Sequence, residues 1–253
     1  MNENEKDLMT TWATTAWTKV FAGGKEGDNA LQARKDLLVR YHEAVYHYFL
    51  LKIRNPHDAG ELYTNFALRL METSDLVKNA TPEKGRFRHY LKAALHHMVL
   101  DYHRRRTRDR KVQPLALDVA QHDVVSDQSG EAGGDFPPIW RQELLNQAWK
   151  ALEKIEKKTG QLHYTVLRFQ SDHPDLKAPQ IADQLSAKMG KPFTHDGVRQ
   201  TLHRAREKYA VLLLEEVERS MENPTMDDLE AELIDLQLLS FCKKALEKRR
   251  AVA

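Results

Sequence analysis

The chain has 253 residues, of which 30% are charged and 41% hydrophobic, and its formal net charge is only +2. This length allows one large domain or two small ones, each able to bury a core. No apolar run approaches the roughly 20 residues of a membrane span, and neither the single cysteine, Cys242, nor the first residues indicate disulfides or export. We therefore expect a soluble, helix-rich, cytoplasmic protein.

Helical periodicity dominates the first 111 residues. Apolar side chains return at helical spacing over residues 10–21, 33–54 and 58–72, with Asp58 as the expected N-cap of the third helix. After the turn "NATPEKG", a fourth helix is predicted over "GRFRHYLKAALHHMVLDYHRRRTRDRK", residues 85–111. We assign residues 1–35 to an N-terminal helical extension and residues 36–111 to a first domain.

The second half of the chain is also predicted to be helical. Residues 112–138 lose the periodicity, and "SDQSGEAGGDFPP" has the composition of a flexible linker. Helices are predicted at residues 139–157, 162–171, 179–189 and 195–221, and a last amphipathic helix at residues 227–248. The fold class is therefore all-α: a first helical domain, a linker, a second domain at residues 139–222, and a C-terminal helical extension at residues 223–253.

Positive charge is concentrated in the fourth helix. Residues 84–111 hold ten Lys and Arg against two Asp, a local net charge of +8. Such a surface suits successive phosphates, and the aromatic residues at its start are suited to stacking on an unstacked base. The alternative is an ordinary solvated helix end. The candidate DNA contacts of this domain are Arg86, Phe87, Arg88, Tyr90, Lys92, His96, His97, Arg104, Arg105, Arg106 and Arg108.

The second domain contains a helix-turn-helix pattern. In "APQIADQLSAKMGKPFTHDGVRQTLHRAREKY", Thr194 is the expected N-cap of the second helix. Side chains that can read base edges lie opposite the apolar arc of that helix, with arginines beside them for phosphates. The candidate DNA contacts are Arg199, Gln200, His203, Arg204 and Arg206. The turn is longer than usual, and two core helices with a charged exterior would give the same pattern.

Catalytic and metal-binding patterns are lacking. There is no Gly-rich phosphate loop, nucleophile elbow or converging carboxylate pair, so we expect no enzyme activity and no cofactor. The histidines of "HEAVYH" are five positions apart, about 140° around a helix, which is wrong for a zinc motif. We expect no metal site.

The order of three segments resembles a known family. "DAGELYTNFALRL", "TPEKGRFRHYLKAALHHMVLDYHRRR" and "THDGVRQTLHRAR" follow one another as in extracytoplasmic function (ECF) type bacterial sigma factors, and are similar to the planctomycete-like "ERGRF" group, which is often associated with Ser/Thr kinases. The resemblance covers residues 36–111 and 139–220. In its most specific motif, "FRHYL" stands for Phe-Arg-x-Trp-Leu, so Tyr90 replaces Trp. His97 replaces a common Asn.

The resemblance implies a sigma factor that directs core RNA polymerase to specific promoters, with a sigma region 2-like helical bundle and a sigma region 4-like helix-turn-helix. The first domain would melt the minus-ten element with residues 79–88 and the helix that follows, and the second would read the minus-thirty-five element. Partners would be promoter DNA and the β′ clamp helices and β flap of polymerase. Contacts to the clamp would come from Asp58, Glu61, Leu62, Thr64 and Asn65.

The same helix suggests a mode of regulation. Gly60 and Asn65 stand where the family carries acids, so attraction to the basic clamp should be weak. A phosphate on Thr64 would restore negative charge, which makes Thr64 a phosphorylation candidate for a Ser/Thr kinase. An anti-sigma factor is the other regulator that the resemblance implies.

The C-terminal helix is open to two interpretations. Its leucine seam, with acids outside at Asp227, Asp228, Glu230, Glu232 and Asp235, either shields a basic surface or completes the core of the second domain.

Two other functions fit the sequence. One is a DNA-binding transcription regulator with sigma-like domains that does not bind RNA polymerase. The other is a protein-interaction module without salt-dependent affinity for DNA.

Overall fold

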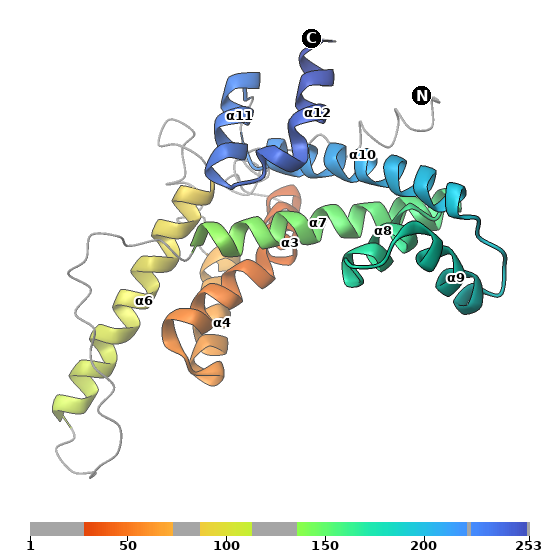
Figure 1. Ribbon diagram of the computed structural model, residues 1–253. Coiled ribbons are helices and arrows are strands. Elements are labelled where there is room, and N and C mark those ends of the chain that lie inside the picture. The colour runs from red at the N-terminus through yellow and green to blue at the C-terminus, as the bar shows by residue number, and fades with distance from the viewer. Residues whose placement is uncertain (1–27, 73–86, 113–135, 222–223, 252–253) are drawn as a thin grey trace. The chain divides into compact units, whose positions relative to one another are not determined.

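The computed structural model describes residues 28–72, 87–112, 136–221 and 224–251, and every regular element in these ranges is an α-helix (Figure 1). The expected all-α class is therefore confirmed for this part of the chain. The helix predicted at residues 10–21 and most of the predicted linker lie outside the described residues. None of the described helices is both long and apolar enough to cross a membrane.

The chain divides into two compact units, residues 1–143 with 219–222, and residues 144–218 with 223–253. The first contains α3 (Asp28–Ile53), α4 (Pro56–Glu72), α6 (Phe87–Val112) and the first turns of α7 (Phe136–Thr159). The second contains the rest of α7, α8 (His163–Asp172), α9 (Ala178–Met189), most of α10 (His195–Arg219), α11 (Met226–Asp235) and α12 (Leu239–Arg250).

An aromatic cluster forms the core of the first unit. Tyr41 of α3 stacks on Trp140 of α7 at 4.9 Å between ring centroids and lies 5.3 Å from Phe87 of α6. Phe136 stacks on Trp140 at 5.8 Å, and Tyr48 meets Phe136 edge-on. All five rings are buried. Segments that are remote in the sequence are thus joined by apolar burial and by favourable ring geometry.

The turn between α3 and α4 corrects the predicted cap. Asn55, not Asp58, precedes the helix, and its Oδ1 accepts hydrogen bonds from the backbone N–H groups of His57 at 2.9 Å and Asp58 at 3.4 Å. Pro56 occupies the first helical position, where its missing N–H costs nothing. Asp58 therefore lies inside the first turn, and its carboxylate is available for another contact.

The helix predicted at residues 227–248 is two helices. Alpha-helix α11 ends at Asp235 and α12 begins at Leu239, and between them Gln237 has a left-handed φ of 57°. The two helices lie side by side (Figure 1). Their buried leucines, Leu229, Leu233 and Leu246, show that the extension contributes to a core.

Candidate nucleic-acid interface

The C-terminal half of α6 is a basic surface, composed of His103, Arg104, Arg105, Arg106 and Arg108, all exposed. Arg104 forms an ion pair with Asp101 at 3.3 Å, and Arg106 pairs with Asp58 of α4 at 3.1 Å. Arg105 and Arg108 form no ion pair with any described residue. Part of the charge of this helix is therefore left for an external partner.

Asp58 is held by two side chains of α6. Its Oδ2 accepts hydrogen bonds from the Tyr102 hydroxyl at 2.5 Å and from Arg106 at 3.1 Å. The pKa of Tyr102 is raised by burial and by the hydrogen bond to Asp58. Only 20% of the Asp58 side chain is exposed, so the network fixes α6 against α4 and uses a carboxylate predicted to contact polymerase.

The start of α6 differs from the prediction. Phe87 and Arg88 are both 5% exposed, whereas both were predicted to contact DNA. Phe87 is enclosed by Tyr41 and Trp140, so neither side chain forms part of an open binding surface. Arg86, predicted to act beside them, lies outside the described residues.

The middle of α6 is partly accessible. Lys92 and His96 are half-buried, and His97 is exposed. Tyr90 is half-buried and lines an apolar cavity of about 30 Å³ between α3, α4 and α6, where burial raises its pKa. The cavity holds about one water molecule and is far too small for a nucleobase.

The outer surface of α4 carries the remaining predicted polymerase contacts. Glu61, Thr64 and Asn65 are exposed and border a shallow hollow, whereas Leu62 is 7% exposed and belongs to the core. The Thr64 hydroxyl donates to the Gly60 carbonyl oxygen at 2.9 Å. Leu62 is therefore corrected from a contact residue to a packing residue, because it lies on the apolar face of α4.

The helix-turn-helix pattern forms as predicted at its turn. Gly190, with a φ of 64°, ends α9, and the Ser186 hydroxyl accepts the N–H of Phe193 at 2.8 Å. The Oγ1 of Thr194 accepts the N–H of Gly197 at 3.1 Å, which confirms Thr194 as the N-cap of α10. These bonds fix a turn that is longer than usual.

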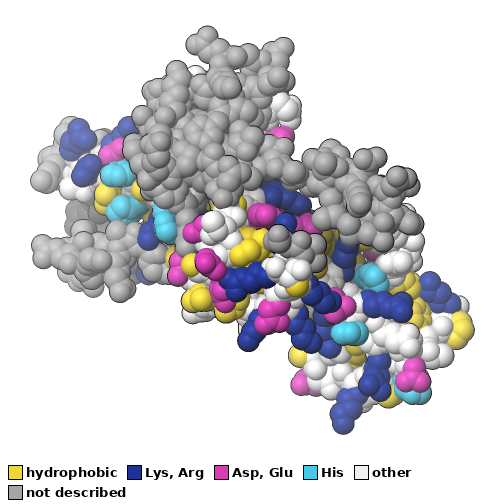
Figure 2. Space-filling model, turned by 90° about the horizontal axis from the view of Figure 1, so that it is seen from above, with side chains coloured by type: hydrophobic (Ala, Val, Ile, Leu, Met, Phe, Trp, Pro, Cys, Tyr) yellow, Lys and Arg dark blue, Asp and Glu magenta, His cyan; other side chains and the backbone are white. Residues whose placement is uncertain are grey.

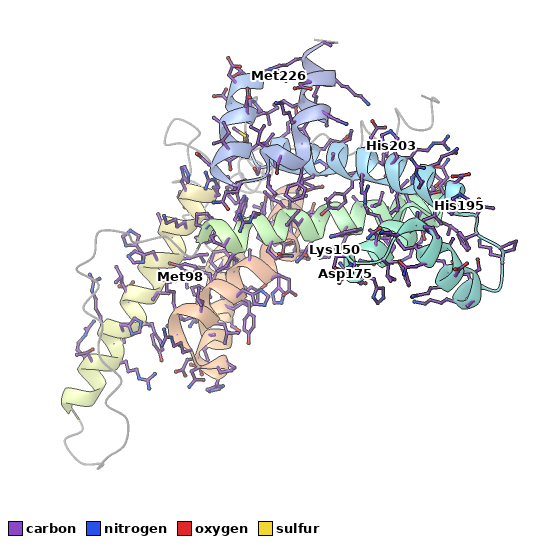
Figure 3. The ribbon with its side chains drawn as sticks, viewed as in Figure 1. Met98, Lys150, Asp175, His195, His203 and Met226 are labelled. Atoms are coloured by element: carbon purple, nitrogen blue, oxygen red, sulfur yellow. The ribbon has the colours of Figure 1, made fainter. Side chains whose placement is uncertain are left out.

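The first half of α10 presents the predicted reading residues to solvent. Arg199, Gln200 and His203 are exposed, as are Arg204 and Arg206, while the apolar side of the same helix is buried through Val198, Leu202 and Ala205. His195 and His203 mark this part of α10 in Figure 3. Figure 2 shows Lys and Arg side chains recurring along the described surface, mixed with acids and histidines.

Sequence reasoning missed Tyr102 as a positioning residue. Its spacing of four residues from Arg106 was visible in the sequence, and Arg106 donates to its hydroxyl oxygen. The shared acceptor, Asp58, is 44 residues from Tyr102 and could not be assigned without the tertiary structure.

Comparison with known proteins adds no relative: no family model, curated protein or solved structure matches this chain. Across the part of the chain that the structure describes, no three His, Cys, Asp or Glu side chains converge as a metal site would require.

Proposed function

We propose that this protein is a sigma factor that directs core RNA polymerase to promoters. The observation that carries the proposal is the capped, solvent-exposed first half of α10, which offers Arg199, Gln200 and His203 to a major groove. The step from DNA binding to polymerase recruitment rests on the sequence resemblance described above.

In this proposal the two units have different tasks. Alpha-helix α10 reads the upstream promoter element through base edges, with Arg204 and Arg206 on phosphates. The basic surface of α6 holds the DNA backbone near the minus-ten element, chiefly through Arg105 and Arg108, which have no internal ion pair among the described residues. The exposed part of α4 at Glu61, Thr64 and Asn65 contacts polymerase.

The proposal is tested by mixing the purified chain with core RNA polymerase and a pool of genomic DNA fragments. Co-elution with core and run-off transcripts from a defined subset of fragments are expected. Transcription that is no more selective than that of core alone would refute the sigma role.

Paired variants separate the two kinds of DNA contact. Arg199→Ala should cost about 1–3 kcal/mol on the preferred upstream element and much less on random DNA. Arg206→Ala should weaken binding to both DNAs equally, as a phosphate contact does. Equal losses for Arg199→Ala on the two DNAs would contradict its role in base reading.

The α6 surface has its own matched control. Arg105→Ala with Arg108→Ala should reduce the slope of log affinity against log salt by about 0.7–0.9 per lost contact. Arg104→Ala should change it less, because that side chain pairs with Asp101 at 3.3 Å. An unchanged slope for the double variant would remove this surface from the mechanism.

One observation favours a second function, a DNA-binding regulator that does not bind polymerase. Asp58 is engaged by Tyr102 and Arg106, which leaves Glu61 as the exposed acid beside Thr64 on α4. Failure to co-elute with core polymerase, together with sequence-selective DNA binding, would establish this alternative.

Phosphorylation of Thr64 would supply the missing charge. The hydroxyl is exposed, and it donates a hydrogen bond to the carbonyl oxygen of Gly60 within the same helix. A phosphate adds about −1.5 to −2 charges. Core affinity should rise for phosphorylated protein or for Thr64→Glu relative to Thr64→Ala, and tight binding by all forms would exclude the switch.

A further inference from the structure

The C-terminal helix α12 packs directly on α10. Cys242 is fully buried with its Sγ 3.8 Å from the carbonyl oxygen of Ala210, and Lys248 Nζ lies 3.0 Å from Glu207 Oε1. Arg249 pairs with Glu218 at 2.8 Å. These contacts lie on both sides of the point where α12 crosses α10, and they fix the position of α12 on that helix.

Asp227, Asp228 and Glu230 of α11 have partners within the C-terminal extension itself. Asp227 and Glu230 both bind Arg250 of α12, Asp228 is tied to Thr225 at the start of α11, and Glu232 is 1% exposed. Shielding of a basic surface by these acids, one of the two interpretations of this helix, stays a prediction.

Helix α12 contacts α10 on the same face as the reading residues Arg199 and His203. At 100° per residue, Arg199, His203, Glu207 and Ala210 fall within about 80° of the helix circumference. Ala210 and Glu207 are contacted by α12, and His203, which is labelled on α10 in Figure 3, lies one turn before Glu207 in the sequence. The face of α10 that carries Arg199 and His203 thus continues into the part of α10 that contacts α12.

Two lysines of α12 lie near Glu207 of α10. Lys248 reaches Glu207, and Lys244 lies one turn earlier on the same face of α12. The pKa of Glu207 is lowered chiefly by its bond to Lys248, with smaller effects from His203 and Lys244, so these groups surround one carboxylate. Lys244, Lys248 and Glu207 together leave a net positive charge beside His203.

We propose that Lys244 and Lys248 form a second phosphate-binding surface, which grips the DNA backbone bordering the groove that α10 enters. The distance between the reading residues and the α12 lysines along α10 supports DNA as the ligand. Arg199 and Glu207 are separated by about 12 Å along α10, which exceeds the roughly 8.5 Å depth of the major groove that a recognition helix enters with its N-terminal residues. A helix that inserts Arg199 therefore brings the α12 lysines to the bordering strand. The inference rests on the proposed DNA binding by α10.

The test uses the full chain and a mixed-sequence duplex of about 30 base pairs in fluorescence anisotropy titrations. A full phosphate contact from Lys244 contributes about 0.9 to the salt slope, and Lys248 adds at most the same because it pairs with Glu207 at 3.0 Å. Raising salt from about 0.1 M to 0.4 M should therefore weaken wild type about 3.5- to 12-fold more than it weakens Lys244→Ala/Lys248→Ala. Lys243→Ala is the matched control, because Lys243 is exposed on another face of α12.

Glu207→Gln is an independent test, because it should change the affinity for the duplex in the opposite direction. Removing this carboxylate frees Lys248 and should raise affinity for the duplex at 0.1 M salt severalfold. Unchanged or higher affinity of the double lysine variant, or no gain from Glu207→Gln, would overturn the inference and leave an acidic protein as the ligand to examine.

The α12 surface and DNA binding by α10 can be refuted separately. If Arg206→Ala weakens binding to the mixed-sequence duplex while the lysine variants match wild type, only the α12 surface is refuted. If wild type binds no duplex at low salt, the proposed function falls and the inference with it.

Discussion

Cys242 is the only cysteine of the chain and reports directly on the packing of α12 against α10. Its side chain is fully buried, and burial raises the pKa of the thiol from an ordinary value of 9.0 to about 12. Only the thiolate reacts with disulfide reagents. At pH 8, roughly one thiol in 10,000 is ionised at this pKa, against roughly one in ten at the ordinary value, so reaction should slow about a thousandfold from ionisation alone.

The measurement is the reaction of native protein with an aromatic disulfide reagent at pH 8, followed by absorbance. Almost no thiol should react over minutes in buffer, and one equivalent should react at once in denaturant. The control is Cys242→Ala/Phe241→Cys, which moves the thiol to the adjacent position, where Phe241 is 61% exposed. Native Cys242 reacting within tenfold of this control thiol would refute the packing of α12.

Three further changes test other parts of the fold by urea denaturation. Gly60→Ala should raise the free energy of unfolding by about 0.5–1 kcal/mol, since a Cβ there meets no atom within 4 Å. Gly197→Ala should gain about 1 kcal/mol less than Gly60→Ala, because its Cβ would lie 2.9 Å from Thr194 Oγ1 and displace the cap; equal gains would contradict this. Asp58→Ala should lower stability by about 1–2 kcal/mol by removing the acceptor of two α6 side chains, and an unchanged midpoint would show that the network is not stabilising. Folding raises the thiol pKa of Cys242 from 9.0 to about 12, so the unfolded state loses this proton at lower pH than the folded state does. The free energy of unfolding should therefore fall by about 1.4 kcal/mol per pH unit between these two pKa values. A series of urea melts above pH 9 would detect this loss.

Helical periodicity predicted most of the described elements, and its errors have local causes. The start of α7 lies at Phe136 rather than at residue 139, because Pro137 and Pro138 read as linker residues although proline fits the first turn of a helix. The break between α11 and α12 was invisible because Gln237, which adopts the left-handed conformation, is neither Gly nor Asn. The domain limits drawn from sequence stay a prediction.

Exposure in the candidate interface was predictable where a helix has one buried face. The apolar arc of α10 fixes which way Arg199 and His203 point, and both are exposed. At the start of α6 the same reasoning failed for Arg88, which is 5% exposed although it lies outside the apolar arc of the helix. The position of Lys248 beside Glu207 depends on how α12 crosses α10, which no periodicity encodes.

The aromatic core of the first unit has a consequence for synthesis on the ribosome. Tyr41 and Phe87 are translated well before Trp140, which closes over both at 4.9 and 6.2 Å. A nascent chain that has emerged only through α6 therefore exposes rings that the finished protein buries, and such surfaces favour aggregation and chaperone binding. Translational pauses between residues 113 and 135 would lengthen this exposure, and a truncated chain ending there would lack the residues that complete its core.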